Sequence, residues 1–319
     1  MVLCSYFSRP ALTLGCCLPH RRSGAGSFSP SIPTPVPAFP SLIRNLLRPQ
    51  QLPHWWQDAL LALPRVVCGY LLTADFGAAK FGLPWSPPDN NLGLFEVAFW
   101  FPQDVAAYGG IFAMFPNFFA WMGAFSEGIG GLLLVLGLLT RPAAFLVCCT
   151  MLVAVFMQQF QNGLWNMLPA LGFLWAALPA LVLGSGRFGL DYRLTKSAIG
   201  RLRPGLVGLA ALLLPGCVQP AHDKTVVYLL DVSGHPKVQQ VGLRGRDKPL
   251  SWDYDLQMTP IIKDSLYRAV VTTHTGYKVT EVKFAINGDY ELKQKANRRI
   301  EFGPADTTVY RARFDVVAQ

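Results

Sequence analysis

Four long apolar stretches dominate the middle of the chain, and a region of mixed polar and apolar residues follows them. The apolar stretches cover residues 59–81, 118–139, 142–157 and 165–183. An α-helix needs about 20 apolar residues to cross a bilayer, and the third stretch approaches that length when residues 158–160 extend it. Short polar breaks separate the last three, so these helices must run antiparallel to their neighbours. The pattern predicts a membrane all-α four-helix bundle.

The last hundred residues show a different pattern. Short segments enriched in β-branched and aromatic residues are separated by glycine-containing turns at 233–234, 275–276 and 287–289. The strands predicted from this pattern are 225–232, 238–244, 267–273, 279–286, 297–302 and 308–317. Short, regularly spaced strands with such turns favour a β-sandwich. We therefore expect a C-terminal all-β immunoglobulin-like sandwich.

Charge follows the same division. The 319 residues are 51% hydrophobic and 15% charged, with a net charge of +9. Residues 218–319 carry 12 acidic and 15 basic residues, an ordinary balance for a water-exposed domain, whereas residues 58–200 carry only 7 acidic ones. These values exclude a disordered chain and argue against a cytosolic enzyme. No basic run alternates with aromatic residues, so we expect no nucleic-acid partner.

Composition divides the chain into four segments. Residues 1–52 are rich in Pro, Ser and Arg, and this segment contains no acidic residue. It is read as a disordered or targeting segment, or as a start assigned too far upstream. Residues 53–200 hold the four helices, residues 201–220 a short fifth apolar segment, and residues 221–319 the β-sandwich.

The fifth apolar run covers residues 205–216 and is short for a span, but it has the length of a signal-peptide core. Leu214-Pro215-Gly216-Cys217 resembles a bacterial lipobox, which would make Cys217 a lipidation site and the chain a lipoprotein. The alternative is a short membrane-entering helix with an incidental thiol. In either case the segment carries the chain outward. A third alternative is a fusion of two genes from which the lipobox releases a lipoprotein.

Lys and Arg mark the cytoplasmic loops of membrane proteins. Arg44, Arg48, Arg141 and the basic residues at 187–203 all fall inside when both ends of the bundle are cytoplasmic, and Lys80 alone falls outside. The loop 84–108 then faces outward, and its aromatic residues suit a segment lying on the bilayer. We expect a multi-pass protein of the cell membrane whose C-terminal domain is periplasmic or extracellular.

Four ionisable residues lie in the predicted helices: Arg65, Asp75, Lys80 and Glu127. Such groups are costly in lipid unless they are paired, and they commonly mark function. Arg65 and Glu127 can approach through their long side chains, while Lys80 can extend to the interface. A structural ion pair and a functional intramembrane polar site both remain open.

Motifs for other chemistry are missing from the sequence. The seven cysteines contain no CxxC pair, and the five histidines all lie outside the apolar stretches, which excludes a histidine-ligated haem in the membrane. There is no phosphate-binding loop, no nucleophile triad and no spacing typical of metal ligands. We therefore expect no catalytic residue, no metal and no cofactor carried by these motifs.

Three motifs resemble the DoxX family of small four-helix membrane proteins. They are Arg65-Val66-Val67-Cys68-Gly69 continuing to Lys80-Phe81-Gly82, Glu127-Gly128-Ile129-Gly130-Gly131 continuing to Thr140-Arg141, and Gly186-Arg187-Phe188-Gly189-Leu190-Asp191. The resemblance implies an integral membrane protein. Some members are subunits of sulfur- or quinone-linked oxidoreductases, so an alternative function is the membrane subunit of such a complex. Arg65, Lys80 and Glu127 would then surround a quinone, and a redox subunit would be the partner. Asp75 is not part of the family pattern.

The C-terminal region resembles starch- and glycogen-binding modules, in particular family 20 carbohydrate-binding modules. The resemblance rests on Pro249-Leu250-Ser251-Trp252-Asp253, Val282-Lys283-Phe284, Tyr290-Glu291 and Asn297-Arg298. It implies a glucan platform of Trp252, Lys283 and Tyr290, with Asn297 as a polar contact. The family prefers Trp at the position of Tyr290.

An aromatic ring can stack on the apolar face of glucose while amide and ammonium donors bind its hydroxyls. The alternative is that Trp252 and Phe284 belong to the core and the domain is a spacer. A glycosidase would need two carboxylates flanking the bond, and Asp289 and Glu291, two residues apart, form a pair by sequence only. The leading prediction is an integral membrane protein that displays a non-catalytic α-glucan-binding module, with membrane lipids and α-glucan as partners.

Overall fold

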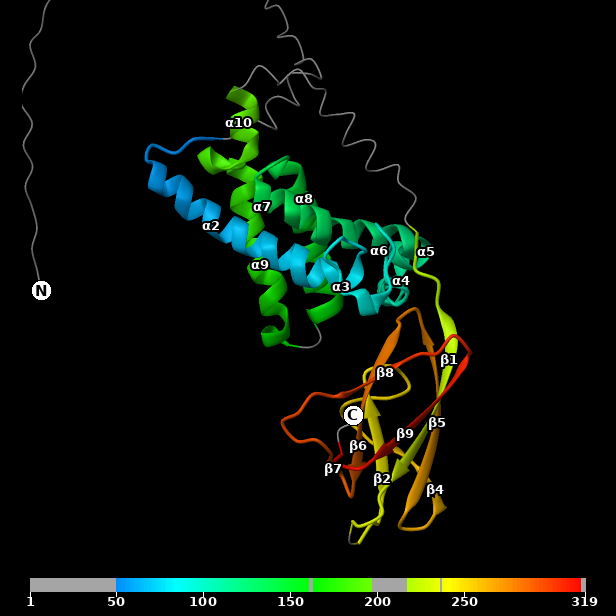
Figure 1. Ribbon diagram of the computed structural model, residues 1–319. Coiled ribbons are helices and arrows are strands. Elements are labelled where there is room, and N and C mark those ends of the chain that lie inside the picture. The colour runs from blue at the N-terminus through cyan, green and yellow to red at the C-terminus, as the bar shows by residue number, and fades with distance from the viewer. Residues whose placement is uncertain (1–49, 161–162, 197–216, 236, 317–319) are drawn as a thin grey trace, which may run out of the picture. The chain divides into compact units, whose positions relative to one another are not determined.

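The computed structural model describes residues 50–160, 163–196, 217–235 and 237–316, all of which belong to one compact unit. The segment predicted at residues 1–52 lies almost wholly outside the described residues, and the apolar run 205–216 lies outside them entirely. Helices precede strands along the chain (Figure 1). A helical region with four long apolar helices and a C-terminal all-β region are therefore both present.

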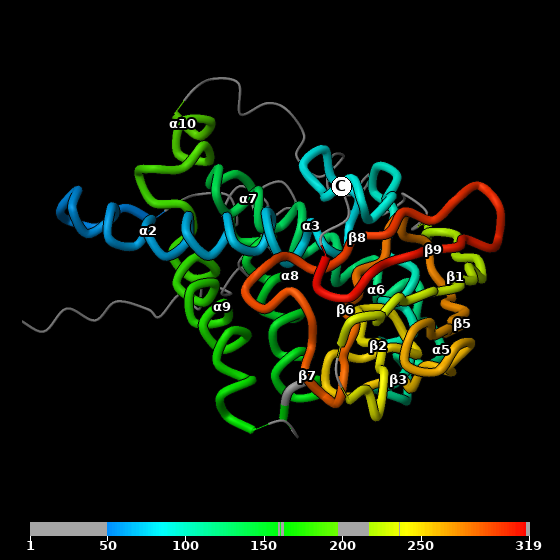
Figure 2. The backbone as a smooth tube through the Cα atoms, turned by 60° about the horizontal axis from the view of Figure 1, so that its bottom comes forward, coloured from blue at the N-terminus to red at the C-terminus, as the bar shows by residue number. Residues whose placement is uncertain are grey.

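Four helices have the length and composition to cross a membrane: Trp55–Lys80, Pro116–Leu136, Thr140–Gln158 and Leu164–Leu183. They confirm the four predicted apolar helices. The first consists of α2 (Trp55–Leu71), a π turn η1 (Leu72–Gly77) and α3 (Ala78–Lys80). The second consists of α6 (Pro116–Phe125), the π turn η3 (Ser126–Gly130) and α7 (Gly131–Leu136). The third is α8 (Thr140–Val153) with the π turn η4 (Ala154–Gln159), and the fourth is α9 (Leu164–Leu183) (Figure 2).

Glycines bring the first two spans into backbone contact. A Cβ added to Gly69 would lie 2.7 Å from the Gly131 carbonyl oxygen, and one added to Gly131 would lie 2.8 Å from the Gly69 oxygen. Further along, a Cβ on Gly77 would lie 2.6 Å from the Gly128 Cα. Small residues at such positions allow the close packing that drives helix association in lipid.

Short elements join and follow the spans. The connection from the first to the second span contains the 3₁₀ turn η2 (Pro88–Asn90) and helices α4 (Phe101–Ala106) and α5 (Gly110–Met114). After α9 come the 3₁₀ turn η6 (Gly186–Phe188) and α10 (Leu190–Lys196). The connection was expected to lie on the bilayer through its aromatic residues. Trp85 and Phe95 are indeed exposed, but Phe101 is buried in a cluster with Phe81, Val97 and Trp121, because α4 packs against α6.

The C-terminal region consists of two sheets. Its strands are β1 (His222–Asp231), β2 (Val241–Gly245), β3 (Leu256–Gln257), β4 (Thr259–Ile262), β5 (Leu266–Thr275), β6 (Val279–Ile286), β7 (Asp289–Tyr290), β8 (Arg298–Glu301) and β9 (Thr307–Arg313). One sheet has the order β4-β5-β1-β9, and the other has the order β3-β2-β6-β7 with β8 paired to β6. β9 pairs with β1 in parallel, and the other paired strands are antiparallel. All six predicted strands are present, and the short β3, β4 and β7 were not predicted.

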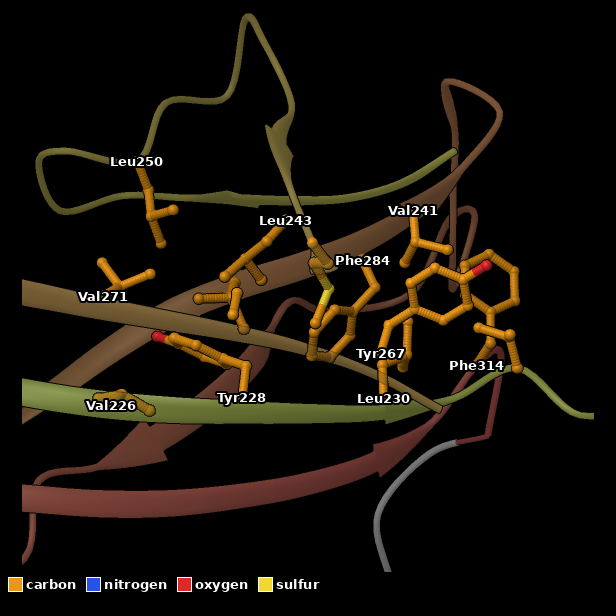
Figure 3. Packing of buried hydrophobic residues seen from close by; sticks show 14 of the residues in the cluster. Val226, Tyr228, Leu230, Val241, Leu243, Leu250, Tyr267, Val271, Phe284 and Phe314 are labelled. Carbon is orange, nitrogen blue, oxygen red and sulfur yellow. The ribbon is translucent and has the colours of Figure 1, made fainter. Parts of the chain in front are cut away.

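Both sheets contribute side chains to one core. Tyr228 and Leu230 of β1 lie against Leu243 of β2 and Phe284 of β6 (Figure 3). Each large apolar side chain buried in this way contributes about 1.5–3 kcal/mol. Phe284 is therefore a core residue, as the spacer alternative assumed, whereas Trp252 is 39% exposed. The all-β region is established, and its assignment as an immunoglobulin-like sandwich stays a prediction.

Candidate functional site

Residues from all three DoxX-like motifs gather around Arg65. The buried guanidinium donates from one Nη to the Leu134 carbonyl at 2.8 Å and from the other to the Phe188 carbonyl at 3.4 Å. Gly137 has a positive φ of 64°, and a side chain there would collide with Arg65 and Gly189. Arg65 therefore fastens the first span to the end of α7 and to η6.

Asp191 caps the third span. Its carboxylate accepts the Leu139 N–H at 2.8 Å, the Thr140 N–H at 3.0 Å and the Thr140 hydroxyl at 2.8 Å. The first N–H groups of a helix have no partner within it, so an acidic side chain at this place stabilises the helix start. Asp191, the last residue of the third motif, therefore has a structural role at the start of α8.

Asp58 and Arg187 form an ion pair at this end of the bundle. Asp58 is buried, its Oδ2 lies 3.1 Å from Arg187 Nε, and its Oδ1 accepts the Leu52 N–H at 3.3 Å. A small cavity lies against Asp58 and Arg65, and Arg65 Nε has no hydrogen-bond partner in the described residues. The sequence analysis did not single out Asp58; an acidic residue in the first turn of an apolar helix was the available signal.

Lys80 and Glu127 pair at the other end of the first span. Lys80 Nζ lies 2.7 Å and 3.0 Å from the two carboxylate oxygens of Glu127, and it also lies 5.1 Å from the centre of the Phe101 ring. The expected approach of Arg65 to Glu127 is therefore wrong. Arg65 precedes Lys80 by 15 residues, about 22 Å along a helix, so the two cations lie too far apart to share one carboxylate.

Asp75 does not join either group. It lies in η1, its side chain is exposed, and no partner is found among the described residues. The four residues predicted as one intramembrane polar site are thus divided among three places. No group of three His, Cys, Asp or Glu side chains in the described parts of the chain could hold a metal ion.

The predicted glucan platform lies on the outer face of the β3-β2-β6-β7 sheet. Arg244 of β2 stands directly opposite Lys283 of β6, next to the core-facing pair of Leu243 and Phe284. The Arg244 guanidinium donates to the Trp252 carbonyl at 3.4 Å, and Lys283 Nζ lies 5.2 Å from the centre of the Tyr290 ring. Both predicted aromatic residues therefore connect to the same pair of strands.

The four predicted platform residues differ in their exposure and in the hydrogen bonds that hold their side chains. Trp252 is 39% and Tyr290 44% exposed. Lys283 is buried and donates to the carbonyls of Leu292 and Lys295 at 3.0 and 3.1 Å. Asn297 is exposed, and its amide donates to Glu281 at 2.9 Å. Lys283 thus fixes the loop that follows Tyr290, and the aromatic pair is the part open to a ligand.

Glu291 is part of a buried ion pair. Arg298 donates to both of its carboxylate oxygens at 2.6 Å, with side chains only 3% and 0% exposed. The carboxylate also accepts the N–H groups of Phe284 and Asp315. The two carboxylates that sequence alone brings near each other have different partners: Glu291 is held by Arg298, while Asp289 is exposed and contacts Lys293.

Four apolar helices that pack through glycines define a multi-pass integral membrane protein. Within this class the comparison with known families gives one result: residues 60–159 match the model of the DoxX family. No curated protein matches the chain. The matched residues include Arg65, Lys80 and Glu127, whereas η6, α10 and the β region lie beyond them.

Proposed function

We propose that this integral membrane protein holds a non-catalytic α-glucan-binding β region outside the cytoplasm. The observation that carries the proposal is the exposure of Trp252 and Tyr290, both connected to the outer face of β2 and β6. Large aromatic side chains offer the apolar area on which a sugar ring stacks. Glu291 is neutralised by Arg298, which supports binding without hydrolysis.

The contacts of the β region support its place outside. Lys278 N–H donates to the Asp89 carbonyl at 3.0 Å, and Asp89 lies in the connection between the first and second spans. Four crossings put α10 on the membrane side opposite that connection. The β region therefore contacts the connection, on the membrane side opposite α10. The lipid anchor predicted at Cys217 stays a prediction, and its thiol is exposed.

Retention of the full-length protein on insoluble amylose tests this function. The detergent must have a polyoxyethylene headgroup, because a maltoside headgroup is itself an α-glucoside and would compete. We expect retention that a soluble malto-oligosaccharide reverses, and at least about a tenfold weaker affinity for Trp252→Ala and for Tyr290→Ala, the loss of about 1.4 kcal/mol. Tyr254→Ala is the matched control, since Tyr254 is an exposed aromatic residue outside the proposed platform. Equal retention of all variants, or none by the unaltered protein, refutes the proposal.

A second candidate is the membrane subunit of a quinone-linked oxidoreductase complex. It is favoured by the Lys80–Glu127 pair, whose side chains are 19% and 6% exposed within an apolar bundle. An ammonium group at this place can donate to a quinone carbonyl. Titration of the purified protein with a short-chain quinone, followed by tryptophan fluorescence, tests it. Saturable quenching that Lys80→Met weakens supports this function, and linear quenching unchanged by the substitution refutes it.

A further inference from the structure

A set of contacts joins the start of the β region to the connection between the first two spans. The Val97 N–H donates to the Cys217 carbonyl at 2.9 Å, and the Gln219 N–H donates to the Val97 carbonyl at 2.8 Å. Val97 also bridges to Phe81 at the end of the first span. A short strand-like ladder therefore runs from Phe81 through Val97 to Val218.

The Gln219 amide lies at the centre of these contacts. Gln219 is only 4% exposed. Its Nε2 lies 2.6 Å from the Asn90 carbonyl oxygen and 3.0 Å from those of Asn91 and Gly276. An amide nitrogen has two protons, so two of the three carbonyls share one of them. Asn90 and Asn91 belong to the connection and Gly276 to the β5–β6 turn, so one buried side chain joins both parts.

Further pairs surround this amide. The Trp100 indole donates to the Tyr277 hydroxyl at 2.7 Å, the Phe99 and Tyr277 rings meet edge to face, and Arg299 pairs with the Asp89 carboxylate. Burial raises the pKa of the Tyr277 phenol, and the indole hydrogen bond opposes that shift. Phe99 and Trp100 of the connection thus contact protein groups, whereas the sequence analysis expected the aromatic residues there to lie on the bilayer.

The fit at Gly276 is close. A Cβ added there would lie 2.6 Å from Gln219 Cδ and 2.8 Å from its Oε1. Real Cβ atoms do not approach other atoms so closely, so a side chain at position 276 would displace the Gln219 amide from its present place. The two surfaces are complementary in shape as well as in hydrogen bonding, as in a specific interface.

We infer that the β region is a docked partner of the connection at residues 81–100, held at a fixed orientation by Gln219, and not a module moving freely on its tether. The surface of the β region that meets the connection is the turn at Gly276–Lys278. This inference is independent of glucan binding.

Hydrogen exchange of the full-length protein in detergent, read by mass spectrometry, tests the docking. The reporters are the N–H groups of Val97, Gln219 and Lys278, which donate across the contact. We expect these segments to be protected in the unaltered protein. Gln219→Ala and Gly276→Ala should accelerate their exchange at least about tenfold, because a buried partner is lost or displaced.

Two controls keep the experiment decisive. Protection of the β1–β5 pairs, such as Val226 opposite Val271, must be unchanged in the variants, which shows that the β region is still folded. Gln239→Ala removes an exposed glutamine of the same region and should change nothing. Fast exchange of the three reporters in the unaltered protein overturns the inference. So does slow exchange that Gln219→Ala leaves unaltered while β1–β5 protection is intact.

Discussion

Replacing Arg298 by methionine should destabilise the β region, because it leaves the buried carboxylate of Glu291 without its ionic partner. Arg298 supplies both hydrogen bonds to Glu291 and also donates to the Arg313 and Val316 carbonyls at 2.9 and 2.8 Å. Without it, the buried Glu291 carboxylate keeps only the N–H groups of Phe284 and Asp315, at 3.1 and 3.2 Å.

Breaking one partner of a buried ion pair typically costs about 3–5 kcal/mol, because the remaining charge is uncompensated. A second substitution isolates this cause. Glu291→Gln removes the charge and retains a carbonyl oxygen that can accept an N–H. The double variant Glu291→Gln with Arg298→Met should therefore be more stable than Arg298→Met alone, although it has lost one more native side chain.

Exchange of the slowest amides in β1, which open with the whole β region, measures this loss. A cost of 3–5 kcal/mol corresponds to exchange about 10² to 10⁴ times faster in Arg298→Met. The double variant should recover at least part of that factor. If it exchanges as fast as the single variant or faster, the destabilisation does not come from the stranded carboxylate, and the reasoning is refuted.

Three further changes test the membrane domain and the acid response. Gly131→Ala should lower the melting temperature in detergent, at a cost of about 1–3 kcal/mol, since the new Cβ meets the Gly69 carbonyl and backbone cannot move aside easily. Asp191→Ala should cost about 0.5–2 kcal/mol and loosen the start of α8, seen as faster exchange at Thr140. Hydrogen bonds from Ser233 lower the pKa of Asp231. The ionised carboxylate therefore stabilises the fold above pH about 4, and this contribution is lost as pH falls through the lowered pKa. In Asp231→Asn the free energy of unfolding should therefore fall less steeply on acidification.

The first two of these changes have a matched control. Gly172→Ala puts the same methyl group where nothing lies within 4 Å, and an equal loss there would contradict the role given to close packing at Gly131. Thr195→Ala is the control for Asp191→Ala, because it alters α10 beside Asp191 and leaves the carboxylate that binds the start of α8. Slowed or unchanged exchange at Thr140 in Asp191→Ala would contradict the role of Asp191 as the cap of α8. An unaltered acid profile for Asp231→Asn would contradict the contribution of Ser233.

The number and type of the elements could be predicted because their signals are local. Four apolar stretches of span length and six short β-rich segments both survive in the structure. The short β3, β4 and β7 escaped because two to four residues carry no readable alternation. Trp252 and Tyr290 were predicted through a resemblance; both are exposed, and their role as a glucan platform stays a prediction.

The pairing of charges could not be predicted, because it depends on which ends of the helices meet. Distance along the first span separates Arg65 from Lys80, so Glu127 has one cation within reach and not two. Lys283 was expected to face a ligand, but the loop after Tyr290 folds over it. Gln219 gave no signal at all, since a single glutamine after an apolar run has no pattern until Gly276 and Asn90 surround it.

The π turns η1, η3 and η4 interrupt three of the four spans. A π turn closes with a bond one residue longer than that of an α-helix, so the side chains beyond it are rotated by about one residue position, some 100°. Two carbonyls within these turns also accept side chains: the Thr73 oxygen accepts the Trp85 indole at 3.0 Å, and the Gly128 oxygen accepts the Thr73 hydroxyl at 2.6 Å. A substitution scan along the first span should therefore show a tolerance pattern whose phase jumps at Leu72–Gly77, and a helical wheel drawn from Trp55 would assign Lys80 to the wrong side.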